Sequence, residues 1–251
     1  MRTKLLGVSI DRVGRWEALC AIERRIVHQK QTVVFTPNPI IISRALRDRN
    51  FSDILNRGDL NLADGVGISV AARLAKIPPF PRVAGIDLAK DLLAYADRAG
   101  LRVFLLGGKP QIAERAAITL RRRFPHLRVC GVHHGYFEER ETASICRQIR
   151  DSRADILFVC TGSPRQEAWI DANRSVLPTV KILIGLGGAL VVWAGAVTRA
   201  PHLISMVGLE WLWRMLLEPR RLAGIPDILL FLLAAAREGN DHKQHPCYTQ
   251  R

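Results

Sequence analysis

Residues Arg102–Gly108 (RVFLLGG) and Asp155–Gly162 (DILFVCTG) decide the fold class. Each is a short, nearly continuous apolar run that ends in glycine, which is typical of a parallel strand buried on both faces. The segment between them carries amphipathic helical patterns, and parallel strands need such long crossover connections. The sequence therefore predicts a mainly parallel sheet that is covered by helices on both faces.

The same alternation of strands and helices extends from the start of the chain to near Trp193. Predicted strands are Lys4–Ser9, Thr32–Thr36, Leu60–Ala63, Arg102–Leu106, Leu127–Gly131, Ile156–Cys160 and Lys181–Leu186. Predicted helices include Trp16–His28, Pro39–Arg47, Val66–Lys76, Ile86–Ala99, Pro110–Phe124, Glu139–Asp151 and Gln166–Asn173. This order indicates a Rossmann-like, doubly wound α/β fold, in which ligands bind beyond the carboxyl ends of the strands.

Composition narrows the classes of protein. The chain has 251 residues and a formal net charge of +14, which predicts an anionic partner: nucleic acid, an anionic membrane surface or a phosphate-rich substrate. Its five cysteines are scattered without a C-x-x-C pair, which argues against a zinc ribbon, a redox motif or a secreted disulfide framework. No window holds the roughly 18 apolar residues of a spanning helix, and no signal peptide is recognisable, so we expect a cytoplasmic protein.

From Pro201 onward the alternation gives way to two helical patterns, Leu203–Leu217 and Arg220–Arg237. They mix tryptophans and leucines with arginines, which is typical of a helix in a membrane interface. Two helices packed on the core, with their arginines in solvent, are the alternative. We divide the chain into an α/β domain (1–195), a C-terminal helical appendage (196–237) and a polar tail (238–251) that we expect to be disordered.

Several common signatures are absent. The sequence has no G-x-x-x-x-G-K-[ST] phosphate loop, no G-x-G-x-x-G after the first strand, no H-E-x-x-H and no D-x-D pair. A nucleic-acid-binding module is an alternative that the charge suggests, but no helix-turn-helix, RRM or OB pattern is present. An oxidoreductase or epimerase on a similar sheet is a second alternative, and it lacks both the glycine fingerprint and a Tyr-x-x-x-Lys pair.

Polar and glycine residues gather where the predicted strands end. These clusters are Thr36-Pro37-Asn38-Pro39, Asp64-Gly65, Gly107-Gly108-Lys109, Thr161-Gly162-Ser163 and Gly185–Gly188. A carboxylate such as Asp64 at this edge is a candidate general base, and the helix N-termini are candidate phosphate sites. The alternative is that Asn38 and Asp64 cap helices and that the glycines only form turns.

The order of the motifs resembles the WecG/TagA/CpsF family of glycosyltransferases. The matching motifs are T-P-N-P (36–39), L-A-D-G-V-G-I (62–68), P-R-V-A-G-I-D-L (81–88), G-S-P-R-Q-E-x-W (162–169), G-L-G-G-A-L (185–190), R-A-P (199–201) and G-L-E-W-L-W-R (208–214). The resemblance covers roughly residues 3–225. One departure is Val191-Val192, where the family more often has an aromatic residue followed by aspartate.

The resemblance implies an inverting, metal-independent and cofactor-free enzyme. It would transfer an N-acetylmannosamine-type sugar or a hexose from a UDP-sugar to a polyprenyl-diphosphate-linked saccharide, at the inner face of the cell membrane, during synthesis of cell-surface polysaccharide. Asp64 is then the general base, and Thr36 and Asn38 form the polar pair beside it. The expected substrate-binding residues are Arg82, Gln166, Gly107, Gly108, Gly162, Arg214, Arg220 and Arg221. The sequence leaves a homo-oligomer open.

Overall fold

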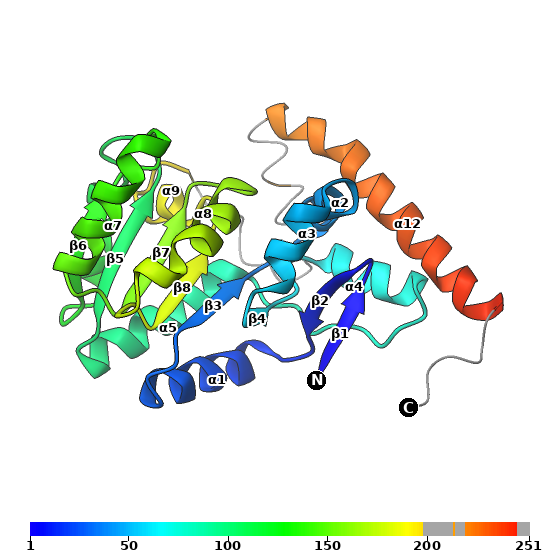
Figure 1. The fold of residues 1–251 in the computed structure, drawn as a ribbon, viewed down its shortest axis with the longest axis horizontal. Helices are drawn as coiled ribbons and strands as arrows, with labels where there is room; N and C mark the ends of the chain where they lie inside the picture. Colours follow the sequence, from blue (N-terminus) through cyan, green and yellow to red (C-terminus); the bar gives the residue numbers. More distant parts are fainter. Residues whose placement is uncertain (198–212, 214–218, 245–251) are drawn as a thin grey trace.

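The computed structural model describes residues 1–197, 213 and 219–244. Its centre is a six-stranded sheet with the order β4-β3-β8-β7-β5-β6 and every pair parallel (Figure 1). The strands are β3 (Thr32–Phe35), β4 (Leu60–Asn61), β5 (Arg102–Gly107), β6 (Arg128–His133), β7 (Ile156–Cys160) and β8 (Ile182–Gly185). The predicted Rossmann-like α/β fold is thereby confirmed.

Alternate residues of each central strand point to opposite faces of the sheet, and each face has its own core. In β5, Phe104 and Leu106 join one core while Val103 and Leu105 join the other. The first face is covered by α2 (Pro39–Arg47), α3 (Arg49–Asn56), α4 (Val66–Leu74), α7 (Thr142–Asp151), α8 (Arg165–Asn173) and α12 (Ile225–Gln244). The second is covered by α1 (Arg15–Val27), α5 (Gly85–Ala99), α6 (Ile112–Arg123) and α9 (Ala189–Trp193). Burial on both faces explains why the strands read as continuous apolar runs.

The prediction for the first strand is wrong. Instead of one strand over Lys4–Ser9, the chain forms an antiparallel hairpin of β1 (Arg2–Leu5) and β2 (Val8–Asp11). Leu6 and Gly7 connect them, and both have positive φ angles, 53° and 80°. This is the backbone that a two-residue hairpin turn with the right twist requires, and glycine adopts it without strain.

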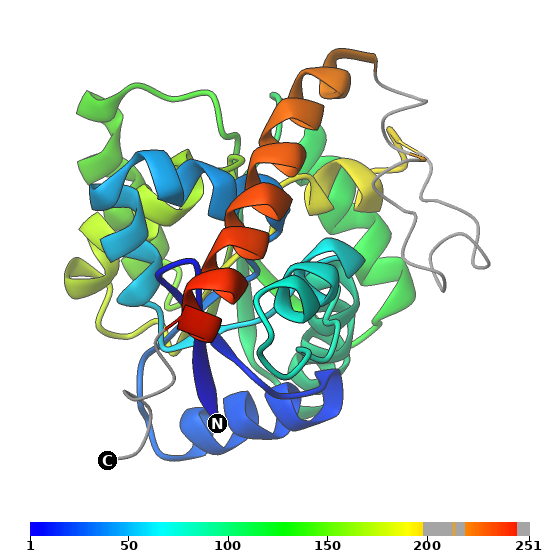
Figure 2. The ribbon, with the colours of Figure 1, turned by 90° about the vertical axis from the view of Figure 1, so that its right-hand side faces the viewer.

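Helix α12 lies across the molecule against α2 and α4 (Figure 2). Phe231 and Ala235 are fully buried in the same core as the sheet. Polar contacts fix it further: an ion pair joins Asp227 to Arg47, and the Leu6 amide donates to Glu238 Oε2 at 3.3 Å. This helix therefore adds to the core of the α/β unit.

The end of α12 corrects the sequence prediction. We expected the helix to end at Arg237 and a disordered tail to begin at residue 238, but the helix continues to Gln244. Lys76 Nζ donates to the Gly239 carbonyl at 2.6 Å, and a Cβ at Gly239 would come within 2.1 Å of the Leu74 carbonyl. Close packing on α4 thus holds this turn of the helix in place. Among the helices of the described ranges, none is long and apolar enough to cross a membrane.

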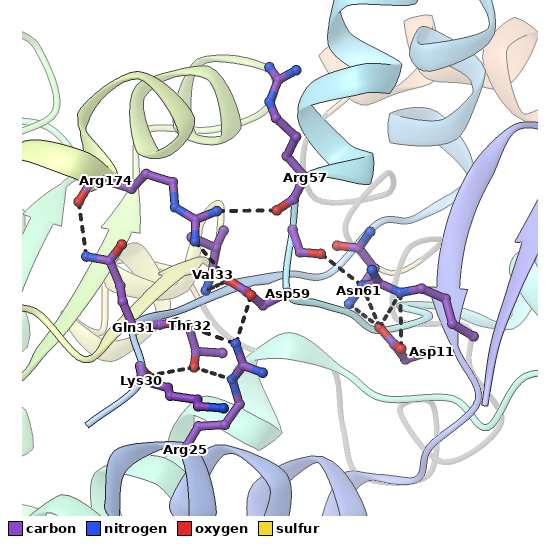
Figure 3. A network of polar contacts seen from close by, with 12 residues as sticks. Asp11, Arg25, Lys30, Gln31, Thr32, Val33, Arg57, Asp59, Asn61 and Arg174 are labelled. Carbon is purple, nitrogen blue, oxygen red and sulfur yellow. Dashed lines mark hydrogen bonds and ion pairs between the residues drawn. The ribbon is translucent and has the colours of Figure 1, made fainter. Parts of the chain in front are cut away.

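The amino edge of the sheet is held by a polar network around Asp59 (Figure 3). Its carboxylate accepts from Arg25 Nη2 at 2.8 Å, from Arg174 Nη2 at 3.1 Å and from the Val33 amide at 2.9 Å. These contacts join α1, β3 and the 3-10 turn η2 (Arg174–Val176) to the loop before β4. The network fixes the starts of β3 and β4, so the loops at their carboxyl ends emerge side by side.

Candidate active site

The carboxyl edge of the sheet carries a cavity of about 620 Å³. In the strand order, β4, β3 and β8 are neighbours, so the segments that follow them meet at one place. Four residues predicted from the sequence line this cavity: Thr36, Asn38, Asp64 and Arg82. The fold therefore brings residues as distant in sequence as Thr36 and Arg82 into one site.

Asn38 has a structural role that the sequence left open. Its side-chain oxygen accepts from the Ile41 amide at 3.0 Å, so Asn38 caps α2, and Pro39 occupies the first position of that helix. A cap of this kind fixes the direction in which the helix leaves the strand. The cap holds Asn38 at the cavity wall.

Asp64 follows β4 and opens the turn before α4. Its backbone amide donates to the Pro37 carbonyl at 3.0 Å, which ties this turn to the Thr36–Asn38 turn. The Val83 amide donates to the Ala63 carbonyl at 2.8 Å, and this bond brings the segment that carries Arg82 beside it. Three chain segments are thus joined by main-chain hydrogen bonds around one carboxylate.

Three helix N-termini face the cavity. Its lining includes the first residues of α2, α4 and α5, and neither α4 nor α5 has a side-chain cap. The N-terminus of α5 approaches closely, because a Cβ at Gly85 would lie only 3.0 Å from Thr36 Oγ1. The dipole of a helix makes its N-terminus positive, which favours anions such as phosphate.

Arg44 and Asp227 also line the cavity, and sequence reasoning missed both. Arg44 lies one helical turn after Ile40, another lining residue, so the i to i+4 spacing on α2 is the signal that could have found it. Its Nη1 donates to the Ser163 carbonyl at 2.8 Å. Asp227 comes from α12, and no pattern in the sequence predicts which loops this helix crosses.

The remaining sequence candidates lie elsewhere along the same edge. Gly107 ends β5, Gly108 follows it, and Gly162 comes after β7; none of the three lines the cavity. A Cβ at Gly107 would come within 2.4 Å of the Cys160 carbonyl, so strand packing alone accounts for that glycine. Burial raises the pKa of the Cys160 thiol to about 12, which keeps it protonated and unreactive.

Gln166 is buried, with 4% of its surface exposed, and is not among the lining residues. Arg220 and Arg221 belong to the 3-10 turn η3 (Pro219–Gly224), whose last residues Ala223 and Gly224 line the cavity mouth beside α12. Arg214 lies outside the described residues.

Part of the cavity wall is apolar. Val66 and Val70 come from α4, while Ile228 and Leu232 come from α12. The cavity lining therefore combines polar groups, which include the Asp64 carboxylate and two arginines beside helix N-termini, with apolar side chains from α4 and α12. A cavity of this composition at the carboxyl edge of a Rossmann-like sheet is typical of the small-molecule site of an α/β enzyme.

Comparison with known proteins identifies the family. The model of the "Glycosyl transferase WecG/TagA/CpsF family" matches residues 3–245, and the chain belongs to this family. A Bacillus subtilis (strain 168) relative is 33% identical over 216 residues, which cover 84% of this chain and 83% of the relative. A Staphylococcus aureus (strain MRSA252) relative is 30% identical over 238 residues, covering 94% and 92%. Both are named N-acetylglucosaminyldiphosphoundecaprenol N-acetyl-beta-D-mannosaminyltransferase, and the present chain is a glycosyltransferase.

Proposed function

We propose that the protein transfers an N-acetylmannosamine-type sugar from a UDP-sugar to N-acetylglucosamine on a polyprenyl diphosphate. The names of the two relatives support this acceptor and this sugar. The structural observation that carries the proposal is the mixed lining of the cavity, because a lipid-linked sugar diphosphate also has both polar and apolar parts. We assign its sugar and diphosphate to a polar end beside Asp64 and the helix N-termini, and its hydrocarbon chain to an apolar end lined by side chains of α4 and α12.

The chemistry proposed for the polar end is a single displacement. Asp64 accepts the proton of the acceptor hydroxyl, the hydroxyl oxygen bonds to C1 of the donor sugar, and the bond from C1 to the UDP oxygen breaks. The electron pair leaves with UDP. Attack on the face opposite UDP inverts the configuration at C1, and an α-linked donor then yields a β product, the linkage that the names of the relatives specify.

Negative charge develops on the departing UDP, and this charge needs a counterpart. The uncapped N-termini of α4 and α5 supply main-chain amides, while Arg82 and Arg44 supply guanidinium groups that bind phosphate oxygens in pairs. Preorganised donors of this kind stabilise developing charge without reorganising during the reaction. We therefore propose a mechanism that does not require a metal ion.

The outer face of α12 supports binding at a membrane surface. Ile225, Leu229 and Leu233 are spaced four residues apart, so they share one face of the helix, and all three are exposed. Val70 and Leu74 of the neighbouring α4 are exposed as well. This apolar face adjoins the apolar end of the cavity, so an enzyme resting on the bilayer by this face could receive a lipid-linked acceptor. We place the protein at the inner face of the cell membrane.

A transfer assay tests the proposal. The purified chain is incubated with a short-chain polyprenyl-diphosphate-linked N-acetylglucosamine and, in separate reactions, UDP-N-acetylmannosamine, UDP-N-acetylglucosamine or UDP-glucose, each with EDTA. We expect a β-linked disaccharide from the N-acetylmannosamine donor. Product from UDP-glucose alone would assign a different sugar, and product that appears only when Mg²⁺ or Mn²⁺ is restored would refute metal independence.

A further inference from the structure

Gln166 and Glu167 open helix α8 as a buried pair of polar residues. Gln166 has 4% and Glu167 has 1% of its surface exposed. Gln166 Nε2 donates to Glu167 Oε1 at 2.8 Å, and the same amide, through Oε1, accepts from the Gly187 backbone N–H at 2.8 Å. A buried amide whose donor and acceptor are both engaged is fixed in orientation.

The partner of this pair is the turn that follows β8. Gly187 lies within the Gly185–Gly188 turn, and the cavity is lined by Leu186 of this turn and by Ala189, the first residue of α9. A Cβ at Gly185 would lie 3.0 Å from Gln166 Nε2, so the amide packs directly on the end of the strand. Across the turn, Thr36 Oγ1 approaches the Gly185 carbonyl at 3.5 Å. The turn thus stands between the buried pair and the cavity.

We propose that Gln166 and Glu167 act as positioning residues: Glu167 orients the Gln166 amide, and Gln166 holds the Gly185–Gly188 turn, and with it Thr36, at the cavity wall. Neither residue contacts substrate. The predicted effect on turnover rests on the proposed function. The predicted effect on the Gly185–Gly188 turn does not. It also explains a glutamine at position 166, because the amide supplies both an acceptor for the Gly187 N–H and a donor to Glu167, whereas an ionised glutamate has no donor and alanine has neither group.

Glu167 serves this pair as a hydrogen-bond acceptor. Burial is the main cause that raises its pKa, and the hydrogen bond from Gln166 opposes this. A glutamine amide has nearly the shape of a carboxyl group, and its Oε1 can accept the same bond from Gln166 Nε2. Glutamine at position 167 should therefore replace it, whereas alanine should not.

The experiment compares Gln166→Ala, Glu167→Ala and Glu167→Gln with the exposed controls Gln148→Ala and Glu114→Gln. Steady-state transfer kinetics give kcat and KM for both substrates, and hydrogen exchange followed by mass spectrometry gives the protection of peptides spanning 184–190. Where Gln166→Ala does not fold, Gln166→Met keeps most of the side-chain volume but loses both the acceptor for Gly187 and the donor to Glu167.

We expect the two alanine variants to lower kcat by about tenfold, the size of effect that follows from a lost buried hydrogen bond, with KM values changed by less than about twofold. Exchange at 184–190 should accelerate in both. Glu167→Gln should keep kcat and protection within about twofold of the parent, because it retains the acceptor for Gln166.

Two results would overturn the inference. The first is a Gln166→Ala variant with unchanged exchange and a donor KM raised about tenfold, since that pattern belongs to a substrate contact. The second is a Glu167→Gln variant as impaired as Glu167→Ala, since that would require an ionisable group. If the parent shows no transfer at all, the proposed function fails, and the exchange measurement still decides whether the pair holds the turn.

Discussion

Replacing Phe231 by alanine tests whether α12 belongs to the fold or is a detachable appendage. Phe231 is fully buried in the core beneath the sheet, so truncation removes its ring and leaves a cavity between α12 and α4. Substitutions of this kind cost about 3–5 kcal/mol of unfolding free energy. Since natural domains have only about 5–15 kcal/mol in total, the loss is a large fraction of the stability.

The assay is thermal unfolding followed by circular dichroism, with Leu233→Ala as the matched control on the same helix. Leu233 is 59% exposed, so its truncation should change the unfolding free energy by less than about 0.5 kcal/mol. At roughly 2–4 °C per kcal/mol for a chain of this size, Phe231→Ala should lower Tm by about 6–20 °C. A decrease no larger than that of Leu233→Ala would show that α12 contributes nothing to the core, and the wall it forms for the cavity would then be in doubt.

Three further predictions concern the surface, the sheet edge and the buried carboxyl group. Leu233→Asp should weaken co-sedimentation with vesicles of anionic lipid, because it places a charge on the apolar outer face of α12, and it should leave Tm within about 2 °C of the parent. Equal sedimentation of the variant and the parent would show that this face does not make the membrane contact. Asp59→Ala should lower the unfolding free energy measured in urea by about 1–2 kcal/mol, because Arg25 and Arg174 lose a partly exposed partner. An unchanged unfolding free energy would mean that water replaces these contacts at no cost in stability. The raised pKa of Glu167 means that the folded state binds its proton more tightly than the unfolded state, so its contribution to stability is full below about pH 4.3 and declines as the pH rises through the folded-state pKa. Between pH 5 and pH 8, the unfolding free energy measured in urea should therefore fall less for Glu167→Gln than for the parent. An equal fall in both proteins would show that Glu167 does not change its protonation in this range.

The fold was predictable because parallel strands that are buried on both faces have a recognisable apolar sequence pattern. Strands β5 and β7 read as unbroken apolar runs since both of their faces are covered. The hairpin was not predictable from the same rule, because its strands have four residues each and the turn begins with Leu6, a residue that seldom adopts positive φ. Helix α3 was missed because Asp48 both ends α2 and caps α3, so no loop separates the two helices.

The candidate site was partly predictable for a topological reason. Residues at the carboxyl ends of neighbouring parallel strands must meet, and Thr36, Asn38 and Asp64 do. Contacts that depend on tertiary packing have no corresponding pattern in the local sequence. The burial of Gln166 depends on a turn from β8, and the place of Asp227 depends on where α12 crosses α2, so neither could be read from local sequence.

The most direct test of the account is the effect of Asp64→Asn on transfer, measured beside UDP binding by calorimetry. Asp91→Asn, on the exposed side of α5 where Asp91 pairs with Arg15, serves as the control. If Asp64 is the general base, kcat should fall by about 10²–10⁴-fold while the Kd for UDP changes little, because the loss is confined to proton transfer. Turnover within about threefold of the parent would contradict the assignment of Asp64 and, with it, the proposed mechanism.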